Sequence, residues 1–130
     1  AFGSETLIST LEAVKNSYNS YTMDSLALAV GEASIRDEAY FRETCRKVAV
    51  TRDRAADELR ALGFEVTPSL ANFLFATHPK KAAPEIFSAL RGKGIFIRYF
   101  KLPRIDNHLR ITVGTDEQMD ALIAALKQIL

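Results

Sequence analysis

The segment Leu109–Leu122, LRITVGTDEQMDAL, combines a strand, a turn and the start of a helix. Its first five residues alternate between apolar and polar, which predicts a half-buried β-strand with Arg110 on the polar side. Gly114 provides the turn, and Thr115 with Gln118 forms the capping box of the helix. The segment therefore predicts a strand that leads directly into a helix, with one guanidinium group placed on the strand.

The residues around this segment predict a compact unit with the element order β-β-α-β-β-α. Strands are expected at 64–66, 72–76 and 95–100 in addition to the strand at 109–113. One helix begins near Pro84 and ends before Gly92 and Gly94, and the capped helix ends the chain. The fold class predicted for the chain is α/β, and residues 63–130 form an α+β unit within it.

Three helices are expected before this unit, at about 4–15, 23–34 and 37–62. The second helix is rich in Leu and Ala and nearly uncharged, which predicts that it is buried in a larger assembly. The third helix ends at Gly63, the residue type favoured in a left-handed C-cap. Its apolar stripe is interrupted by Arg52.

Composition and charge argue against several classes of function. The chain has 130 residues, of which 48% are hydrophobic and 25% are charged, as in soluble globular proteins. The formal net charge of +1 gives no overall field for attracting nucleic acid or an anionic membrane, and neither partner is expected. A single cysteine, no membrane-length apolar run and no signal peptide predict a cytoplasmic protein. The chain lacks an initiator methionine, and we expect it to be a piece of a longer protein.

Catalytic and metal-binding patterns are sparse. The two histidines, His78 and His108, lack metal-ligand spacing to a cysteine or a carboxylate, and both are expected at the surface. The sequence has no Gly-rich phosphate loop and no serine-nucleophile elbow. We therefore expect no metal site and no self-sufficient active site.

Two arginines within predicted strands are candidate anion-binding residues. Arg98 shares its predicted strand face with Phe96 and Phe100, and Arg110 occupies the strand described above. A planar guanidinium group matches a carboxylate or a phosphate, but an arginine is also ordinary on the solvent face of a sheet. The pattern leaves both interpretations open.

Asn72, Tyr18 and Asn19 are weaker candidates. The Asn72 amide begins a predicted strand and can bind a ligand or orient an arginine, or it can bond to the turn before the strand. Tyr18 and Asn19 lie in a segment that breaks the first helix. That segment can line a cleft or a subunit contact, or be an ordinary loop.

Several of these motifs together resemble a known enzyme family. VTPSLANFLF at 66–75, GIFIRYF at 94–100 and LRITVGT at 109–115 are similar, in order and spacing, to the C-terminal part of histidinol-phosphate aminotransferases. These are fold-type I enzymes that use pyridoxal 5'-phosphate (PLP). AFGSETLI at 1–8 resembles the segment just after the family's cofactor-lysine region, and Tyr18-Asn19 resembles its Tyr-Asn element. The resemblance covers essentially the whole chain.

The resemblance implies roles for the candidate residues. Arg110 matches the arginine that binds the α-carboxylate of the substrate, and Arg98 matches one used for the substrate phosphate. Asn72 takes a supporting role near the carboxylate site. The implied substrates are small molecules, namely glutamate and a phosphorylated imidazole compound, and the implied intact enzyme is a homodimer.

The resemblance also implies what this chain lacks. The family's Schiff-base lysine and most of its cofactor-binding residues precede the matched segment, so no catalytic residue is expected here and the chain alone is expected to be inactive. The implied domains are 1–36 as the end of the large PLP-binding domain, 37–62 as a connecting helix and 63–130 as the small substrate-gripping domain.

Other functions remain open at this point. An aminotransferase for aromatic or other amino acids and a threonine-phosphate decarboxylase share the same scaffold. A different class of protein, a non-catalytic regulatory module that binds amino acids, also fits the β-β-α-β-β-α unit. An assay of the intact protein separates the two kinds of enzyme, because a decarboxylase releases CO2 and needs no amino acceptor. A regulatory module instead predicts a stable, independently folded unit from about Gly63 onward that binds its ligand, whereas an enzyme fragment predicts weak or no binding by the isolated chain.

Overall fold

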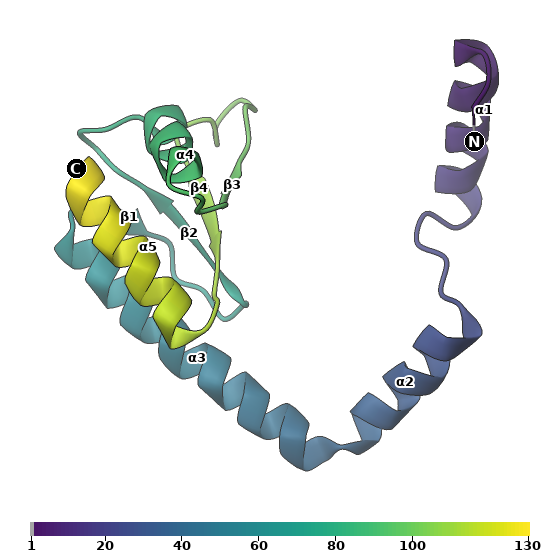
Figure 1. The fold of residues 1–130 in the computed structure, drawn as a ribbon, viewed down its shortest axis with the longest axis horizontal. Helices are drawn as coiled ribbons and strands as arrows, with labels where there is room; N and C mark the ends of the chain where they lie inside the picture. The colour runs from purple at the N-terminus through teal and green to yellow at the C-terminus, as the bar shows by residue number, and fades with distance from the viewer. Residues whose placement is uncertain (1) are drawn as a thin grey trace. The chain divides into compact units, whose positions relative to one another are not determined.

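The computed structural model describes residues 2–130, which form two compact units (Figure 1). The first unit ends at Phe41 and the second covers Arg42–Leu130. The mixture of helices with a small sheet confirms the predicted fold class. None of the helices within residues 2–130 is both long and apolar enough to cross a membrane.

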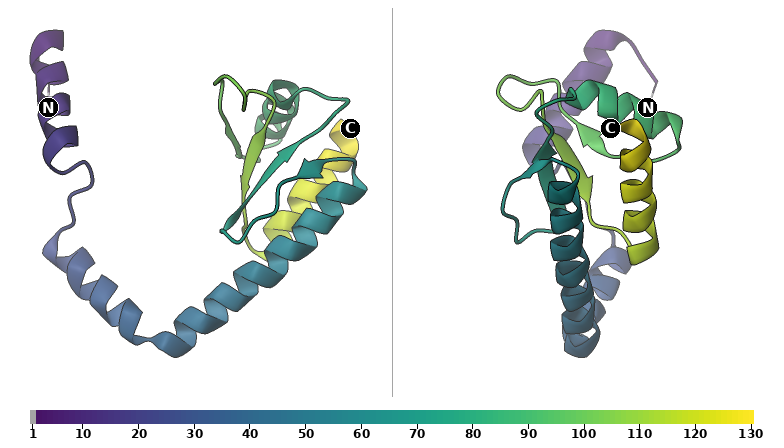
Figure 2. Two further views of the ribbon diagram at one scale, coloured as in Figure 1. Left: turned by 180° about the vertical axis from the view of Figure 1, so that it is seen from behind. Right: turned by 90° about the vertical axis from the view of Figure 1, so that its left-hand side faces the viewer.

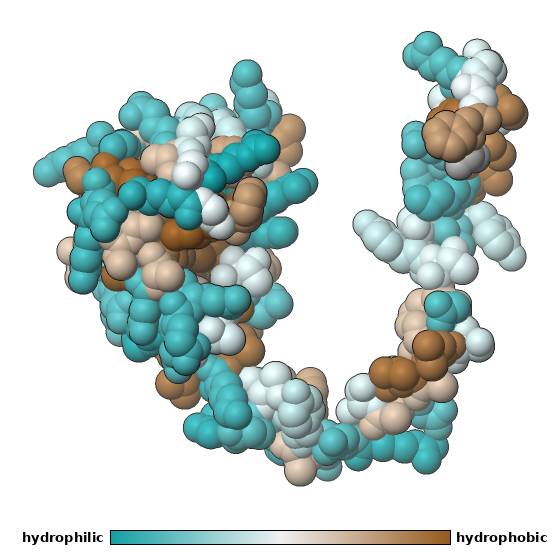
Figure 3. Space-filling view, in the orientation of Figure 1, coloured by the Kyte–Doolittle hydropathy of each residue, from teal (hydrophilic) through white to brown (hydrophobic). Residues whose placement is uncertain are grey.

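Two capped helices make up most of the first unit. Helix α1 spans Glu5–Tyr18 after the N-cap Ser4, and α2 spans Ser25–Arg36 after the N-cap Asp24. Each cap side chain accepts a hydrogen bond from a main-chain N–H three residues later, as N-cap residues do. Neither helix has a buried residue, and Figure 3 shows apolar side chains at their surface. The predicted burial of the second helix in a larger assembly stays a prediction.

Helix α3, Glu38–Ala61, leads into the second unit and contributes buried residues only in its C-terminal half. Beyond its end, the N–H of Phe64 donates to the carbonyl of Leu59 (3.1 Å), and Gly63 has a φ of 89°. This is the glycine C-cap that the sequence predicts. A Cβ at residue 63 would lie 3.2 Å from the His78 ring, so both the backbone angle and the space favour glycine.

A four-stranded antiparallel sheet follows, with the strand order β1-β2-β4-β3 (Figure 1). Strands β1 (Glu65–Val66), β2 (Phe73–Thr77), β3 (Arg98–Tyr99) and β4 (Leu109–Thr112) alternate with two helices. Helix α4 (Ala83–Gly92) connects β2 to β3, and α5 (Asp116–Ile129) follows β4. The predicted order β-β-α-β-β-α is confirmed.

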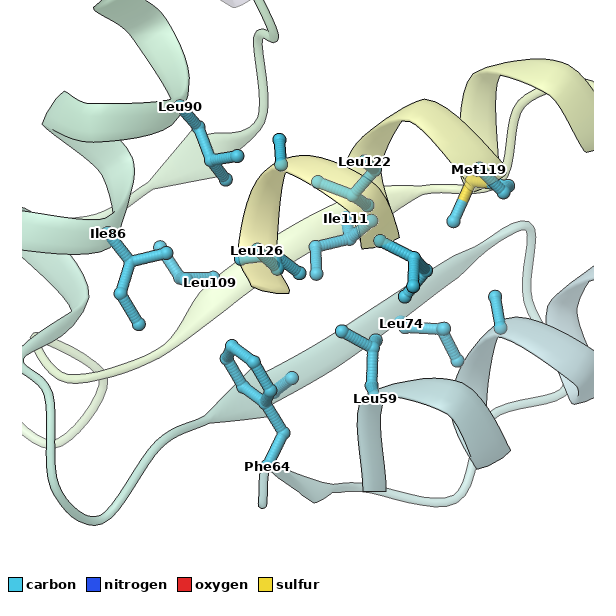
Figure 4. Packing of buried hydrophobic residues seen from close by; sticks show 14 of the residues in the cluster. Leu59, Phe64, Leu74, Ile86, Leu90, Leu109, Ile111, Met119, Leu122 and Leu126 are labelled. Atoms are coloured by element: carbon cyan, nitrogen blue, oxygen red, sulfur yellow. The ribbon is translucent and has the colours of Figure 1, made fainter. Parts of the chain in front are cut away.

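The three helices α3, α4 and α5 pack against one face of this sheet. Figure 2 shows α3 and α5 side by side along the strands, and Figure 4 shows the apolar side chains that fill the space between helices and sheet. Each fully buried Leu or Ile contributes about 1.5–3 kcal/mol relative to exposure. The largest of them are Leu59, Leu74, Ile86, Leu90, Leu109, Ile111 and Leu126.

Two local predictions have different outcomes. The capping box at Thr115 is confirmed, because its hydroxyl accepts from the N–H of Gln118 and the Gln118 side chain accepts from the N–H of Thr115. The prediction of a strand at 95–100 is wrong except at Arg98–Tyr99, the two positions that pair with β4. The N–H of Ile95 instead donates to the carbonyl of Leu90 and closes the end of α4 (3.0 Å).

Candidate substrate-binding site

The face of the sheet opposite the helices carries both candidate arginines. Strand alternation places Leu74, Leu109 and Ile111 toward the helices, so Arg110 points to the opposite side. In the ladder, Arg98 pairs with Arg110 across β3 and β4. We call this side the arginine face and define it by five residues. These are Phe73, Phe75, Arg98, Phe100 and Arg110.

Arg110 lies half-buried between two aromatic rings. Its Cζ is 5.6 Å from the ring centroid of Phe73 and 5.6 Å from that of Phe100, within the range of cation–π attraction. Its Nε is buried and has no hydrogen-bond partner among the described residues. A buried donor without a partner destabilises the fold by about 1–3 kcal/mol. An anionic ligand that accepted a hydrogen bond from this group would offset that loss.

Arg98 is exposed and lies directly opposite Arg110 in the ladder. Its Cζ is 5.3 Å from the ring centroid of Phe100. Like charges at opposed positions of an antiparallel pair are destabilising. Within residues 2–130, no carboxylate forms an ion pair with either arginine, so the arginine face carries two uncompensated positive charges.

Asn72 is exposed immediately before β2, where its carbonyl accepts a hydrogen bond from the N–H of Val113 (2.9 Å). The turn before it is braced, because the Ser69 hydroxyl donates to the carbonyl of Phe73 (2.7 Å) and accepts from the N–H of Ala71. Asn72 thus lies at the end of the β2–β4 ladder that carries Arg110. The supporting role of its side chain stays a prediction.

Tyr18 and Asn19 belong to the first unit. Tyr18 is the last residue of α1 and is exposed, and Asn19 is the C-cap, whose N–H donates to the carbonyl of Lys15 (2.9 Å). Their assignment to a cleft or a subunit contact stays a prediction.

The surface positions predicted for the histidines are wrong for His78 and only partly right for His108. His78 is 8% exposed, because its ring packs edge-on against Phe64 at 5.0 Å beside the side-chain-free Gly63. His108 is half-buried and stacks on Phe75 with the ring centroids 4.7 Å apart. Alternation did not predict either contact because both depend on the folded strand register.

Sequence reasoning placed Phe100 on the face of Arg98 but missed its contact with Arg110, and it missed Phe73. Phe73 and Phe100 contact the guanidinium groups, yet in sequence they resemble ordinary strand hydrophobes. Residues two apart in a strand lie on the same face. Phe73 is two residues from Phe75, and Phe100 is two residues from Arg98, so this spacing is the only sign in the sequence that each phenylalanine belongs to the arginine face. Which ring contacts which arginine depends on the strand order, which spacing does not contain.

The helical side of the sheet has the opposite electrostatics, because its charges are paired. Arg54 of α3 bonds to Asp116 (2.9 Å) and Asp120 (2.6 Å) of α5 and to Glu58 (2.9 Å). Asp116 also accepts from the hydroxyl of Thr51 (2.9 Å). Arg54 and Thr51 together hold the pKa of Asp116 below its ordinary value.

The arginine face can bind anions, but none of its five residues is a metal ligand. Two guanidinium groups on one open face match two carboxylates or one phosphate. Within residues 2–130 there is no cluster of three or more His, Cys, Asp or Glu residues that could hold a metal ion. The arginine face is therefore a candidate site for small, doubly charged anions.

Comparison with known proteins gives consistent matches. The family model described as aminotransferase class I and II matches residues 1–126. Histidinol-phosphate aminotransferase 2 of Dechloromonas aromatica is 54% identical over 129 residues, which are 99% of this chain and 36% of that protein. Histidinol-phosphate aminotransferase 1 of Bordetella parapertussis is also 54% identical, with the same two coverages.

Comparison with solved structures also gives a match to a histidinol-phosphate aminotransferase. The crystal structure of histidinol-phosphate aminotransferase from Sinorhizobium meliloti in complex with pyridoxal-5'-phosphate matches with a TM-score of 0.77 at 30% sequence identity. The match covers 93% of this chain and 34% of the other. The chain therefore spans about a third of the length of the proteins it matches.

Proposed function

The chain belongs to the aminotransferase class I and II family, and we propose that it is the C-terminal, substrate-gripping part of a histidinol-phosphate aminotransferase. The proposed reaction transfers the amino group of L-glutamate to imidazole-acetol phosphate and yields 2-oxoglutarate and L-histidinol phosphate. The names of the relatives that match over 99% of this chain support this choice within the family.

One observation carries the proposal, namely the pairing of Arg98 with Arg110 on an open face without a carboxylate partner among residues 2–130. Glutamate carries two carboxylates, and a phosphate monoester carries a charge of about −1.5 to −2 at neutral pH. Both substrates therefore present close to two negative charges, although the charges are distributed differently. Two adjacent guanidinium groups match either distribution.

The proposal gives each candidate residue a role. Arg110 binds the α-carboxylate of glutamate, and Arg98 binds either the distal carboxylate or the phosphate. Asn72 supports the carboxylate site, and Tyr18 with Asn19 lines a cleft or a subunit contact. The buried, unpartnered Nε of Arg110 supports the first of these roles most directly.

The proposal extends to the whole enzyme. Residues 1–36 end the large PLP-binding domain, 37–62 form the connecting helix and 63–130 form the small domain. The intact enzyme is a cytoplasmic homodimer, and the exposed apolar residues of α2 support the need for a larger assembly.

The cofactor of the family is PLP, and the arginine face does not fit a site for covalent PLP attachment. Such a site needs a lysine amine, and the five residues of the arginine face include no lysine. We therefore assign no step of cofactor chemistry to this face. The chain's share of the reaction is to bind and orient the anionic ends of the substrate, and the chain alone is predicted to be inactive.

Kinetics of the intact enzyme test the proposal. Arg110→Ala should lower kcat/KM for glutamate by at least about 10-fold, because a charge-assisted hydrogen bond contributes about 1.5–3 kcal/mol. The cofactor absorbance should persist. Arg91→Ala is the matched control, since Arg91 is an exposed arginine in the last turn of α4.

Unchanged glutamate kinetics in Arg110→Ala would refute the assignment. Release of CO2 in an assay without any amino acceptor would show that the enzyme is a decarboxylase and not a transaminase.

A further inference from the structure

The ring of Phe100 contacts both guanidinium groups of the arginine face. Its centroid lies 5.3 Å from the Cζ of Arg98 and 5.6 Å from the Cζ of Arg110. Phe73, in contrast, lies at this distance from Arg110 only. Phe100 is thus the aromatic neighbour that the two cationic groups share.

This shared contact opposes two effects that would separate the arginines. The ladder places the two like charges at opposed positions, and their repulsion favours side-chain conformations that point apart. Arginine also has large rotamer entropy, which a single fixed geometry must overcome. Attraction of each guanidinium to the same ring counteracts both effects.

The contact limits the separation of the two charges. The two Cζ atoms lie at most about 11 Å apart, the sum of their distances to the Phe100 centroid. The carboxyl carbons of a five-carbon dicarboxylate are joined by four C–C bonds and lie at most about 6 Å apart. Both ends of such a molecule can therefore reach the two guanidinium groups together.

We propose that Phe100 is a positioning residue that fixes the spacing of Arg98 and Arg110 and thereby makes the arginine face selective for doubly charged anions. The inference rests on the proposed function, because it concerns the same anion site. Phe100 acts through the arginines and does not itself bind the charged groups. Removal of its ring should weaken the binding of two-charge ligands more than the binding of one-charge ligands.

The first test reports on geometry without any ligand. The 130-residue chain is labelled with ¹⁵N, and the Nε–Hε signals of Arg98 and Arg110 are measured, since ring currents shift protons held over an aromatic face. Phe100→Leu and Phe100→Met should move both signals. Phe73→Leu, the matched control, should move the Arg110 signal only, and Phe100→Tyr should leave both near their original positions.

The second test measures selectivity with two probes of similar length. Glutarate carries two carboxylates and butyrate carries one, and each is measured as an inhibitor of the intact enzyme with glutamate as the substrate. The original enzyme should bind glutarate at least about 10-fold more tightly than butyrate. In Phe100→Leu and Phe100→Met this ratio should fall by about 3-fold or more, whereas Phe100→Tyr should restore it.

The outcomes separate the inference from the proposed function. Arginine signals that do not move in either Phe100→Leu or Phe100→Met, while main-chain signals of α5 show an intact fold, would overturn the positioning role. A ratio unchanged in both variants would overturn the selectivity. If glutarate did not inhibit the intact enzyme but the ring-current pattern held, the proposed anion site would fail while the geometric role of Phe100 would be supported.

Discussion

The two faces of the sheet are made by the same strands and have opposite properties. On the helical side, Leu74 and Leu109 are at most 2% exposed, and the charges at the rim are paired. On the arginine face, Arg98 and Arg110 oppose each other without an acidic partner among residues 2–130. The buried apolar packing that stabilises the fold therefore lies on one face, whereas the other face bears positive charges without an acidic partner among residues 2–130.

The largest expected effect comes from truncation on the helical side. Leu74→Ala should lower the free energy of unfolding by about 3 kcal/mol, because it removes a buried side chain and leaves a cavity. Thr112→Ala, an exposed position opposite Phe73, is the control and should change stability by no more than about 1 kcal/mol. Urea unfolding of the chain measures both values. Equal losses in the two variants would contradict the division between the faces.

Much of this division could be predicted from the sequence. Alternation in Leu109–Val113 correctly placed Arg110 away from the core, and the capping box located the start of α5. These features are local, because the strand period and the cap each depend on neighbouring residues. The resemblance to histidinol-phosphate aminotransferases rests on motifs spread along the whole chain and is confirmed by the comparisons.

The rest depends on pairings between distant segments, which a periodic pattern does not contain. The opposition of Arg98 and Arg110 follows from the β3–β4 register, in which only two of the six predicted strand residues pair with β4. Arg52 interrupts the apolar stripe of α3, yet its side chain is buried beside Asp53 and the carbonyl of Ala71. Ala71 lies on a turn distant in sequence, so the helix pattern could not reveal this contact.

A smaller effect is expected from Arg110 itself. Arg110→Met should change the free energy of unfolding by no more than about 1 kcal/mol in either direction. The variant loses cation–π contacts, but it also removes an unsatisfied Nε and the repulsion from Arg98, while the methionine keeps its contact with the rings. Urea unfolding checks this value, with Arg98→Met as the companion variant. A loss above about 2 kcal/mol would show that Arg110 stabilises the fold and would break the contrast between the faces.

The smallest expected effect is a dependence of stability on acidic pH, and it comes from Asp116 on the helical side. The pKa of Asp116 lies below its ordinary value of 3.8 because Arg54 and Thr51 bond to the charged carboxylate. The unfolded chain therefore takes up the proton at a higher pH than the folded chain. The stabilisation is fully present above that ordinary value and is lost as the pH falls through the lower folded pKa.

Asp116→Asn should consequently be less stable than the original chain near neutral pH, and the difference should shrink as the pH falls below about 4. Thermal unfolding at a series of pH values measures this difference. Arg54→Met should produce the same convergence, because it removes the partner that lowers the pKa, whereas Arg98→Met should not. The arginine face has no carboxylate partner to titrate among residues 2–130, so convergence in Arg98→Met would reveal an acidic partner for that arginine in solution and contradict the electrostatic difference between the two faces.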